Sequence, residues 1–203
     1  MNKKDLKEYL KADLYRYGGS TAKSYFLKVF SPKCSPGFRY TYFLRGASAH
    51  SNHSIRGRLF RMFLRHYRYK YGFQIPTRTK IGRGFYMGHF GTTVINGEAK
   101  IGENCNIAHL VTIGQTNRGK LKGCPKIGNM VWIGTGAVIV GNINIGNNVL
   151  VAPNSYVNFD VPADSMVIGN PGKVILNKEA TKDYINFIYQ NAKRPSSCDE
   201  PEK

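Results

Sequence analysis

An aliphatic side chain recurs every six residues through the middle of this chain, and this period constrains the fold more than any other feature. The residue that follows is usually small or asparagine, and a compact side chain usually comes four places after the aliphatic one. Three such hexads can close one triangular coil, with each aliphatic side chain stacked on its copy about 4.8 Å away. A period of six excludes the two-residue alternation of a β-sandwich, so we predict a parallel β-helix. The recurring positions are Ile75, Ile81, Met87, Ile95, Ile101, Ile107, Ile113, Ile127, Ile133, Ile139, Ile145, Val151 and Val157.

The repeat divides the chain into three predicted regions. Residues 1–72 form a basic helical N-terminal segment, because apolar residues recur there at helical spacing. Residues 73–175 form the β-helix, and residues 114–126, where one repeat spacing stretches to fourteen, form a projecting loop. Residues 176–203 are expected to contain a short helix over about 178–191 and a disordered tail. The predicted fold is an all-β core between a helical N-terminal segment and a short C-terminal helix.

The positive charge is concentrated before the repeat. The chain carries a net charge of +18, and residues 1–80 hold 18 Lys and Arg against 3 Asp and Glu. Such a segment favours phosphate-bearing partners, which include anionic lipid and nucleic acid. The segment has no RNP, helix-turn-helix or zinc pattern, so nucleic acid is not an expected partner. We expect instead that the segment contacts an anionic membrane surface, with packing of its apolar face against the β-helix as the alternative.

The expected location is the cytoplasm, with peripheral contact at the inner face of the membrane. The chain has no run of about 18 apolar residues and no secretory signal at its N-terminus. Its four cysteines are widely spread without a CxxC motif, which fits a reducing compartment. Cys105 occupies a compact inward position of its hexad and is expected to lie in the core.

Two histidines in the repeat are the candidate catalytic residues. His89 is the third residue of its hexad, which places it outside the core, beside a spacing of eight residues. His109 follows 20 residues later, so it should lie one coil away on the same face. A neutral imidazole can accept a hydroxyl proton near pH 7. A metal site is not expected, because a zinc ion needs at least three protein ligands and the repeat supplies two histidines.

The middle of the chain resembles the serine acetyltransferase branch of the hexapeptide-repeat acyltransferases. The resemblance covers residues 73–175 and is carried by the run from Ile81 to Gly84, by His89, by Val94-Ile95, by Val111-Thr-Ile-Gly114, by Pro125-Lys-Ile127 and by Gly169-Asn-Pro-Gly-Lys-Val174. The exopolysaccharide O-acetyltransferases of the colanic-acid type resemble it more closely, because they share the Val94-Ile95-Asn96 turn, Cys124-Pro125 and a basic helical N-terminal segment.

This resemblance implies a homotrimeric left-handed β-helix that uses acetyl-CoA as acyl donor. CoA would lie in a groove between coils of adjacent subunits, against Gly114, Gly134, Thr135 and Ala152. Lys173 would meet a CoA phosphate, and a backbone N–H near Gly114 would stabilise the oxyanion. His89 would act as the general base, and His109 would contact the acceptor or the thioester.

The acceptor is where this sequence departs from the serine acetyltransferases. Those enzymes carry charged residues where this chain has Gln74, Gly88, Gly123 and Cys124, and these groups hold the two charged ends of serine. We therefore expect a sugar hydroxyl in capsule, exopolysaccharide or lipopolysaccharide assembly as the acceptor, on a lipid or nucleotide carrier. The alternative is serine O-acetylation in cysteine biosynthesis.

Overall fold

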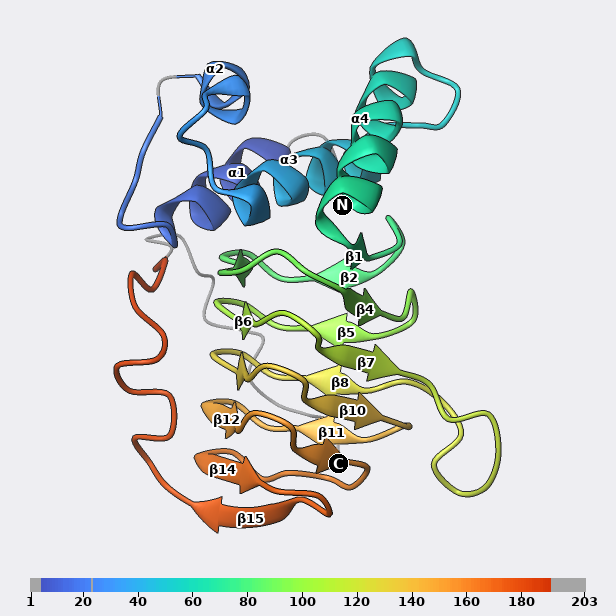
Figure 1. The fold of residues 1–203 in the computed structure, drawn as a ribbon, viewed down its shortest axis with the longest axis vertical. Helices are drawn as coiled ribbons and strands as arrows, with labels where there is room; N and C mark the ends of the chain where they lie inside the picture. Colours follow the sequence, from blue (N-terminus) through green and yellow to red (C-terminus); the bar gives the residue numbers. More distant parts are fainter. Residues whose placement is uncertain (1–4, 23, 191–203) are drawn as a thin grey trace.

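The computed structural model describes residues 5–22 and 24–190, and its core is the predicted parallel β-helix (Figure 1). The strands form three sheets, and within each sheet neighbouring strands belong to successive coils. The first sheet holds β1 (Phe73–Gln74), β4 (Thr93–Ile95), β7 (Thr112–Gly114), β10 (Val138–Val140) and β13 (Tyr156–Val157). The second holds β2 (Lys80–Ile81), β5 (Lys100–Ile101), β8 (Lys126–Ile127) and β11 (Asn144–Ile145). The third holds β3 (Tyr86–Met87), β6 (Asn106–Ile107), β9 (Trp132–Ile133), β12 (Val149–Val151), β14 (Ser165–Ile168) and β15 (Lys173–Leu176).

The aliphatic positions of the repeat stack in register inside the coils. Ile95 pairs with Ile113, and Ile113 pairs with Ile139 one coil further on. All three side chains are almost completely buried. Burying a side chain of this size stabilises the fold by about 1.5–3 kcal/mol, so the interior column is the main source of stability. The fold prediction is thereby confirmed, with parallel pairing throughout except for the antiparallel last strand, β15.

The helices of the described residues, four in number, form a cap on one end of the β-helix (Figure 1). They are α1 (Leu6–Tyr15), α2 (Tyr25–Phe30), α3 (Pro36–Ala49) and α4 (Ile55–Tyr71). Serine side chains at positions 24 and 54 accept backbone N–H bonds at the starts of α2 and α4, as helix N-caps do. Gly72 ends α4 in the left-handed conformation, at φ 78°, and lies against the backbone of Gly91, where a side chain would not fit.

A buried ion pair docks the cap on the first coil. The Arg45 guanidinium of α3 donates to both carboxylate oxygens of Asp13 in α1, at 2.9 and 3.2 Å. It also donates to the carbonyls of Ile81 and Gly82, each at 2.6 Å. The same carboxylate accepts the backbone N–H of Phe85 at 2.9 Å. Both side chains are buried, so cap and coil share one satisfied polar centre.

The chain after β15 corrects one prediction. Residues 177–190 form turns where a helix over about 178–191 was expected, and they run back along the β-helix to the cap (Figure 1). The side chain of Asn106 donates to the carbonyl of Tyr184, and Asn104 exchanges two hydrogen bonds with the backbone of Tyr189. These contacts with the β-helix satisfy backbone groups that a helix would satisfy internally. The predicted disordered tail lies outside the described residues.

Candidate active site

The two histidines lie one above the other at one corner of the β-helix. His89 follows β3 and His109 follows β6, and the pairing of Met87 with Ile107 sets the register of both. Their ring centroids are 5.6 Å apart, with the planes at 74°. His89 is exposed and His109 is half-buried. The two histidines therefore lie on adjacent coils, as the spacing of the repeat predicts.

Residues from the cap hold the segment that carries His89. The Tyr17 hydroxyl, just after α1, accepts the N–H of Met87 at 3.2 Å and donates to the Met87 carbonyl at 3.3 Å. On the other side of the histidine, the N–H of Gly91 donates to the carbonyl of Tyr71 at 2.9 Å. The two extra residues of the eight-residue spacing thus form a short excursion fixed at both ends. Burial raises the pKa of Tyr17, so its hydroxyl stays protonated.

His109 carries a polar atom without a partner. Its Nδ1 atom is buried and makes no hydrogen bond among the described residues. Gly91, at φ 139°, packs against the same side chain, and a Cβ there would lie 3.2 Å from the His109 Cβ. Buried polar atoms are nearly always hydrogen-bonded, so this nitrogen is an exception within the described part of the chain.

Among the described residues, no carboxylate forms an ion pair with His89. Glu98 lies 3.0 Å from the Arg78 guanidinium in an exposed ion pair. The described residues contain no group of three or more His, Cys, Asp and Glu suited to a metal. The histidine pair is therefore the chemically distinctive feature of this corner.

Three of the predicted CoA-contacting residues continue the histidine corner along the coils. Gly134 and Thr135 follow β9, and Ala152 follows β12, so they stand at the positions that Ala108 and His109 occupy after β6. The N–H groups of Gly134 and Ala152 donate to Val151 and Val167. Both N–H groups are therefore used within the β-helix and cannot bind CoA. The contribution of these residues to a CoA site would be their small side chains, which let a ligand come close to the backbone.

The other two predicted CoA-contacting residues, Gly114 and Lys173, lie apart from the histidine corner. Gly114 is the last residue of β7, at the start of the long loop, and pairs with Val140. Lys173 is exposed at the start of β15, at the end of the β-helix away from the cap. Neither residue lies beside the histidines within one chain, and a role for either stays a prediction.

The projecting loop is a small hairpin. Thr116 and Gly123 exchange two backbone hydrogen bonds, at 3.0 and 2.9 Å. Half-buried Cys124 follows, and partial burial raises its pKa, so the thiol is protonated and weakly nucleophilic. Cys105 is completely buried in the core, where burial raises its pKa to about 12. Neither cysteine has the environment of a catalytic nucleophile.

Two apolar side chains beside the histidines were missed by the sequence analysis. Phe90 is 64% exposed and Leu110 is 53% exposed, and each directly follows a histidine. Leu110 has a positive φ of 61°, which is unusual for a branched side chain. The signal in the sequence was a large apolar residue at a place where the repeat does not require one. Both are exposed and next in sequence to a histidine, and the Phe90 ring lies 6.3 Å from that of Tyr71 at the end of α4.

Comparison with known proteins places this architecture in a family. The model of the bacterial transferase hexapeptide (six repeats) family matches residues 124–158. The serine acetyltransferase of Synechococcus elongatus is 39% identical over 104 residues, which cover 51% of this chain and 43% of that protein. The Helicobacter pylori serine acetyltransferase is 38% identical over 104 residues, which cover 51% of this chain and 61% of that protein. The chain spans about half the length of the curated relatives it matches.

Solved structures agree with this placement. The soybean serine acetyltransferase apoenzyme superposes with a TM-score of 0.69 at 31% identity, covering 85% of this chain and 70% of the soybean chain. The Neisseria gonorrhoeae serine acetyltransferase superposes with a TM-score of 0.68 at 28% identity, covering 85% of this chain and 67% of that chain. The chain belongs to the hexapeptide-repeat acyltransferases. Within that class, it is similar to serine acetyltransferases.

These comparisons correct the expected function. The sugar hydroxyl acceptor and the closer resemblance to enzymes of the colanic-acid type were wrong, because the matched relatives and structures are serine acetyltransferases. The expectation rested on four positions, Gln74, Gly88, Gly123 and Cys124, whereas the similarity extends over 104 residues. Differences at single positions were given too much weight against similarity of the whole β-helix.

Proposed function

We propose that this protein transfers the acetyl group of acetyl-CoA to the hydroxyl of serine. The observation that carries the proposal is the exposed His89, fixed above His109 on a β-helix that is similar to serine acetyltransferases. Acetyl transfer between a thioester and a hydroxyl needs a base and a surface that holds both substrates, and it needs no metal.

In the proposed reaction, His89 removes the proton from the serine hydroxyl. The resulting alkoxide attacks the thioester carbonyl carbon, and the tetrahedral intermediate collapses with cleavage of the carbon–sulfur bond. The proton held by His89 passes to the departing CoA sulfur, so the histidine ends neutral. General-base help of this kind contributes a factor of about 10²–10⁴ in rate.

His109 is proposed as the second substrate contact. A small rotation of the half-buried ring would bring its unpartnered Nδ1 atom within hydrogen-bond distance of an acceptor or thioester group, and this would favour one orientation beside His89. Phe90 and Leu110, which are exposed and each next in sequence to one of the histidines, would offer apolar surface to the substrates.

The donor site is proposed to form in a homotrimer. Small residues Gly134 and Ala152 line the coils below the histidines, with Thr135 beside them, and would let a pantetheine chain approach closely. Lys173 would meet a CoA phosphate, and Gly114 would lie next to the groove from the neighbouring subunit. The hairpin loop, which projects from the β-helix, would reach across to that neighbour (Figure 1).

Measurement of CoA thiol release with L-serine, for the wild type and His89→Ala, tests the proposed chemistry. We expect serine-dependent release by the wild type and a loss of at least about a hundredfold in kcat for the variant, with CoA affinity retained. His53→Ala is the matched control, because His53 is an exposed histidine in the loop between α3 and α4. Near-wild-type turnover by His89→Ala would remove His89 as the base, and release independent of serine would remove serine as the acceptor.

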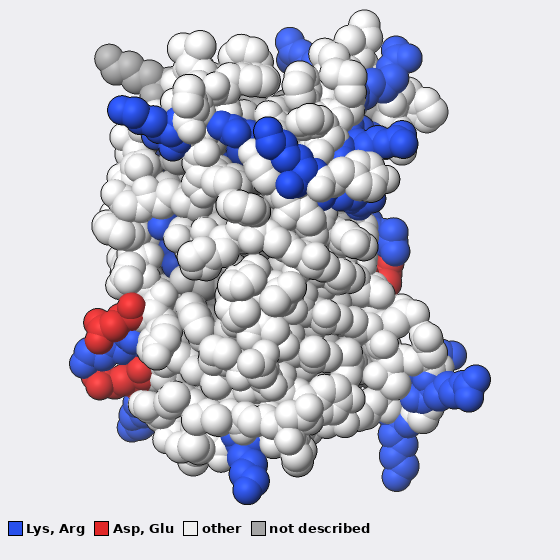
Figure 2. Space-filling model, viewed as in Figure 1, with Lys and Arg blue, Asp and Glu red and all other residues white. Residues whose placement is uncertain are grey.

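We also propose that the cap binds anionic membrane surfaces. Phe26 and Leu27 of α2 are 61% and 71% exposed, and Phe26 lines an apolar groove of about 150 Å³ formed by α2, α3 and α4. Lysine and arginine side chains gather over this cap (Figure 2), and residues 14–97 contain no Asp or Glu. Apolar side chains among cations match the interface of an anionic bilayer. The described chain contains no helix long and apolar enough to cross a membrane.

Co-sedimentation with phosphatidylserine or phosphatidylcholine vesicles tests this surface. We expect binding to the anionic vesicles alone, and loss of binding when Phe26 and Leu27 are both replaced by serine. Leu176→Ser is the matched control, because Leu176 is 74% exposed at the opposite end of the β-helix. Equal sedimentation of the wild type and the Phe26/Leu27 variant, or self-association through this face without vesicles, would contradict the proposal.

A further inference from the structure

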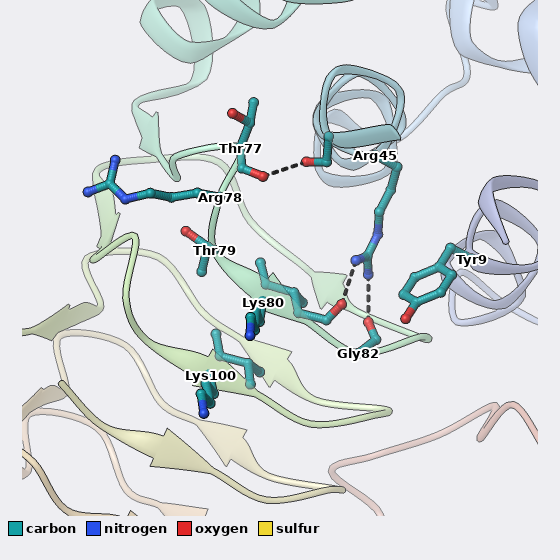
Figure 3. A pocket seen from close by; sticks show the side chains of 11 residues that line it. Tyr9, Arg45, Thr77, Arg78, Thr79, Lys80, Gly82 and Lys100 are labelled. Carbon is teal, nitrogen blue, oxygen red and sulfur yellow. Dashed lines mark hydrogen bonds between the residues drawn. The ribbon is translucent and has the colours of Figure 1, made fainter. Parts of the chain in front are cut away.

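A polar pocket lies where the cap meets the first coils of the β-helix, away from the histidine corner. Its volume is about 560 Å³, within the range of small-molecule sites. Figure 3 shows its walls: Tyr9 comes from α1, Arg45 from α3, and Lys80 and Lys100 from β2 and β5. Hydroxyl groups of Ser48, Thr77 and Thr79 also line it.

Two lysines dominate the charge of this pocket. Lys80 and Lys100 are partners in register on adjacent parallel strands, and Lys126 continues the row one coil further. The side chains of Lys80 and Lys100 point the same way, one beside the other (Figure 3). Strands of this kind are about 4.8 Å apart, so like charges directly opposite one another repel. An anion placed over the row would remove this repulsion.

Nearby carboxylates do not supply that anion. Among the described residues, the ion pairs join Asp13 to Arg45, Glu98 to Arg78, Glu103 to Arg83 and Glu179 to Lys182, and none includes a lysine of the row. Arg45 is neutralised by its buried partner and forms a wall. Arg78 extends away from the two lysines (Figure 3). The two ammonium groups are thus the charges left for a ligand.

We propose that this pocket binds a small molecule with two adjacent phosphate groups, held by Lys80 and Lys100. The spacing of the lysines offers one ammonium to each phosphate, and charge-assisted hydrogen bonds of this kind are the strong ones. Tyr9 and Thr77 give the rest of the ligand neutral hydrogen-bonding partners. The Ser48 hydroxyl already donates to the carbonyls of Leu44 and Thr77. The Thr79 hydroxyl donates to the carbonyl of Asn96. The pocket volume accommodates a group larger than the phosphates themselves.

The pocket is separate from the proposed active site. Its lysines stand on the sheet of β2, β5, β8 and β11, whereas His89 and His109 follow strands of the sheet that begins with β3. The proposal therefore stands whether or not the chain acetylates serine. CoA also contains adjacent phosphates, so the test must separate this pocket from the CoA site.

Isothermal titration calorimetry with inorganic pyrophosphate tests the proposal, on the full chain at low and moderate salt. We expect saturable binding of one pyrophosphate per chain, at least about tenfold tighter than inorganic phosphate, because two charged contacts replace one. Lys80→Gln and Lys100→Gln should each weaken binding about tenfold or more. Lys126→Gln is the matched control, since Lys126 belongs to the same row but does not line the pocket.

Two measurements show whether pyrophosphate binds in this pocket or in the CoA site: titration in the presence of CoA, and the activity of the lysine variants. We expect the same pyrophosphate affinity when CoA is present at saturation, and unchanged serine-dependent CoA release in the Lys80 and Lys100 variants. Absence of saturable binding, undiminished binding by the double variant, equal affinity for phosphate and pyrophosphate, or displacement by CoA would each overturn the proposal. Thermal unfolding of the variants shows that they remain folded.

Discussion

The buried pair of Asp13 and Arg45 makes a sharp test of how the cap is attached. In Asp13→Ala, the Arg45 guanidinium keeps its two carbonyl partners but loses the carboxylate that neutralises it. The N–H of Phe85 also loses its acceptor. Both side chains are buried, so water does not replace the missing charge.

The size of the effect follows from this burial. Removing one partner of a buried ion pair costs about 3–5 kcal/mol of unfolding free energy, because the remaining charge is uncompensated. For a chain of this length, 1 kcal/mol corresponds to a shift in Tm of about 2–4 °C. We therefore expect Asp13→Ala to lower Tm by roughly 6–20 °C.

Thermal unfolding followed by circular dichroism measures this shift. Glu98→Ala is the matched control, because it removes an ion pair of similar length whose side chains are 66% and 69% exposed. Exposed pairs contribute about 0–1 kcal/mol, so the control should lose less than about 4 °C. Replacing both residues, as Asp13→Leu with Arg45→Met, should cost less than Asp13→Ala alone. Equal shifts for Asp13→Ala and Glu98→Ala would refute the reasoning.

Two further predictions concern the core and the cysteines. Ile113→Ala should lower the unfolding free energy by about 2–5 kcal/mol, because Ile113 is fully buried between Ile95 and Ile139, and urea unfolding measures the loss. A loss no greater than that of Leu176→Ala, at an exposed site, would contradict the packing account. N-ethylmaleimide should label half-buried Cys124 well before Cys105, whose pKa is about 12, as followed by peptide mass spectrometry. Labelling of Cys105 at an equal rate in the folded protein would show that its coil opens.

The coils could be predicted from the sequence because their information is local and repeated. Each hexad places one aliphatic side chain inside, so Ile107 and Ile133 meet in register without any knowledge of distant contacts. The same arithmetic predicted that His89 and His109 stack, since 20 residues are one coil plus the two extra residues of the excursion. The site was predictable to the extent that it follows the repeat.

The remainder depends on contacts between distant residues. The Asp13 carboxylate accepts a hydrogen bond from the N–H of Phe85, 72 residues further along the chain. No periodicity in the sequence predicts that pairing. Residues 177–190 have a helical pattern but instead take their partners from the β-helix, among them Asn104 in a turn and Asn106 in β6. Tertiary hydrogen bonds outweigh local preference there. The acceptor was misjudged because substitutions at single positions do not reveal how a whole site is built.

The most direct test of the proposed function is identification of the product. Purified protein is incubated with L-serine and acetyl-CoA labelled with ¹³C in the acetyl group, and the mixture is analysed by mass spectrometry. The account predicts labelled O-acetylserine in amounts equal to the CoA released, with formation reduced at least about a hundredfold in His89→Ala. Failure of the wild-type protein to form O-acetylserine would contradict it.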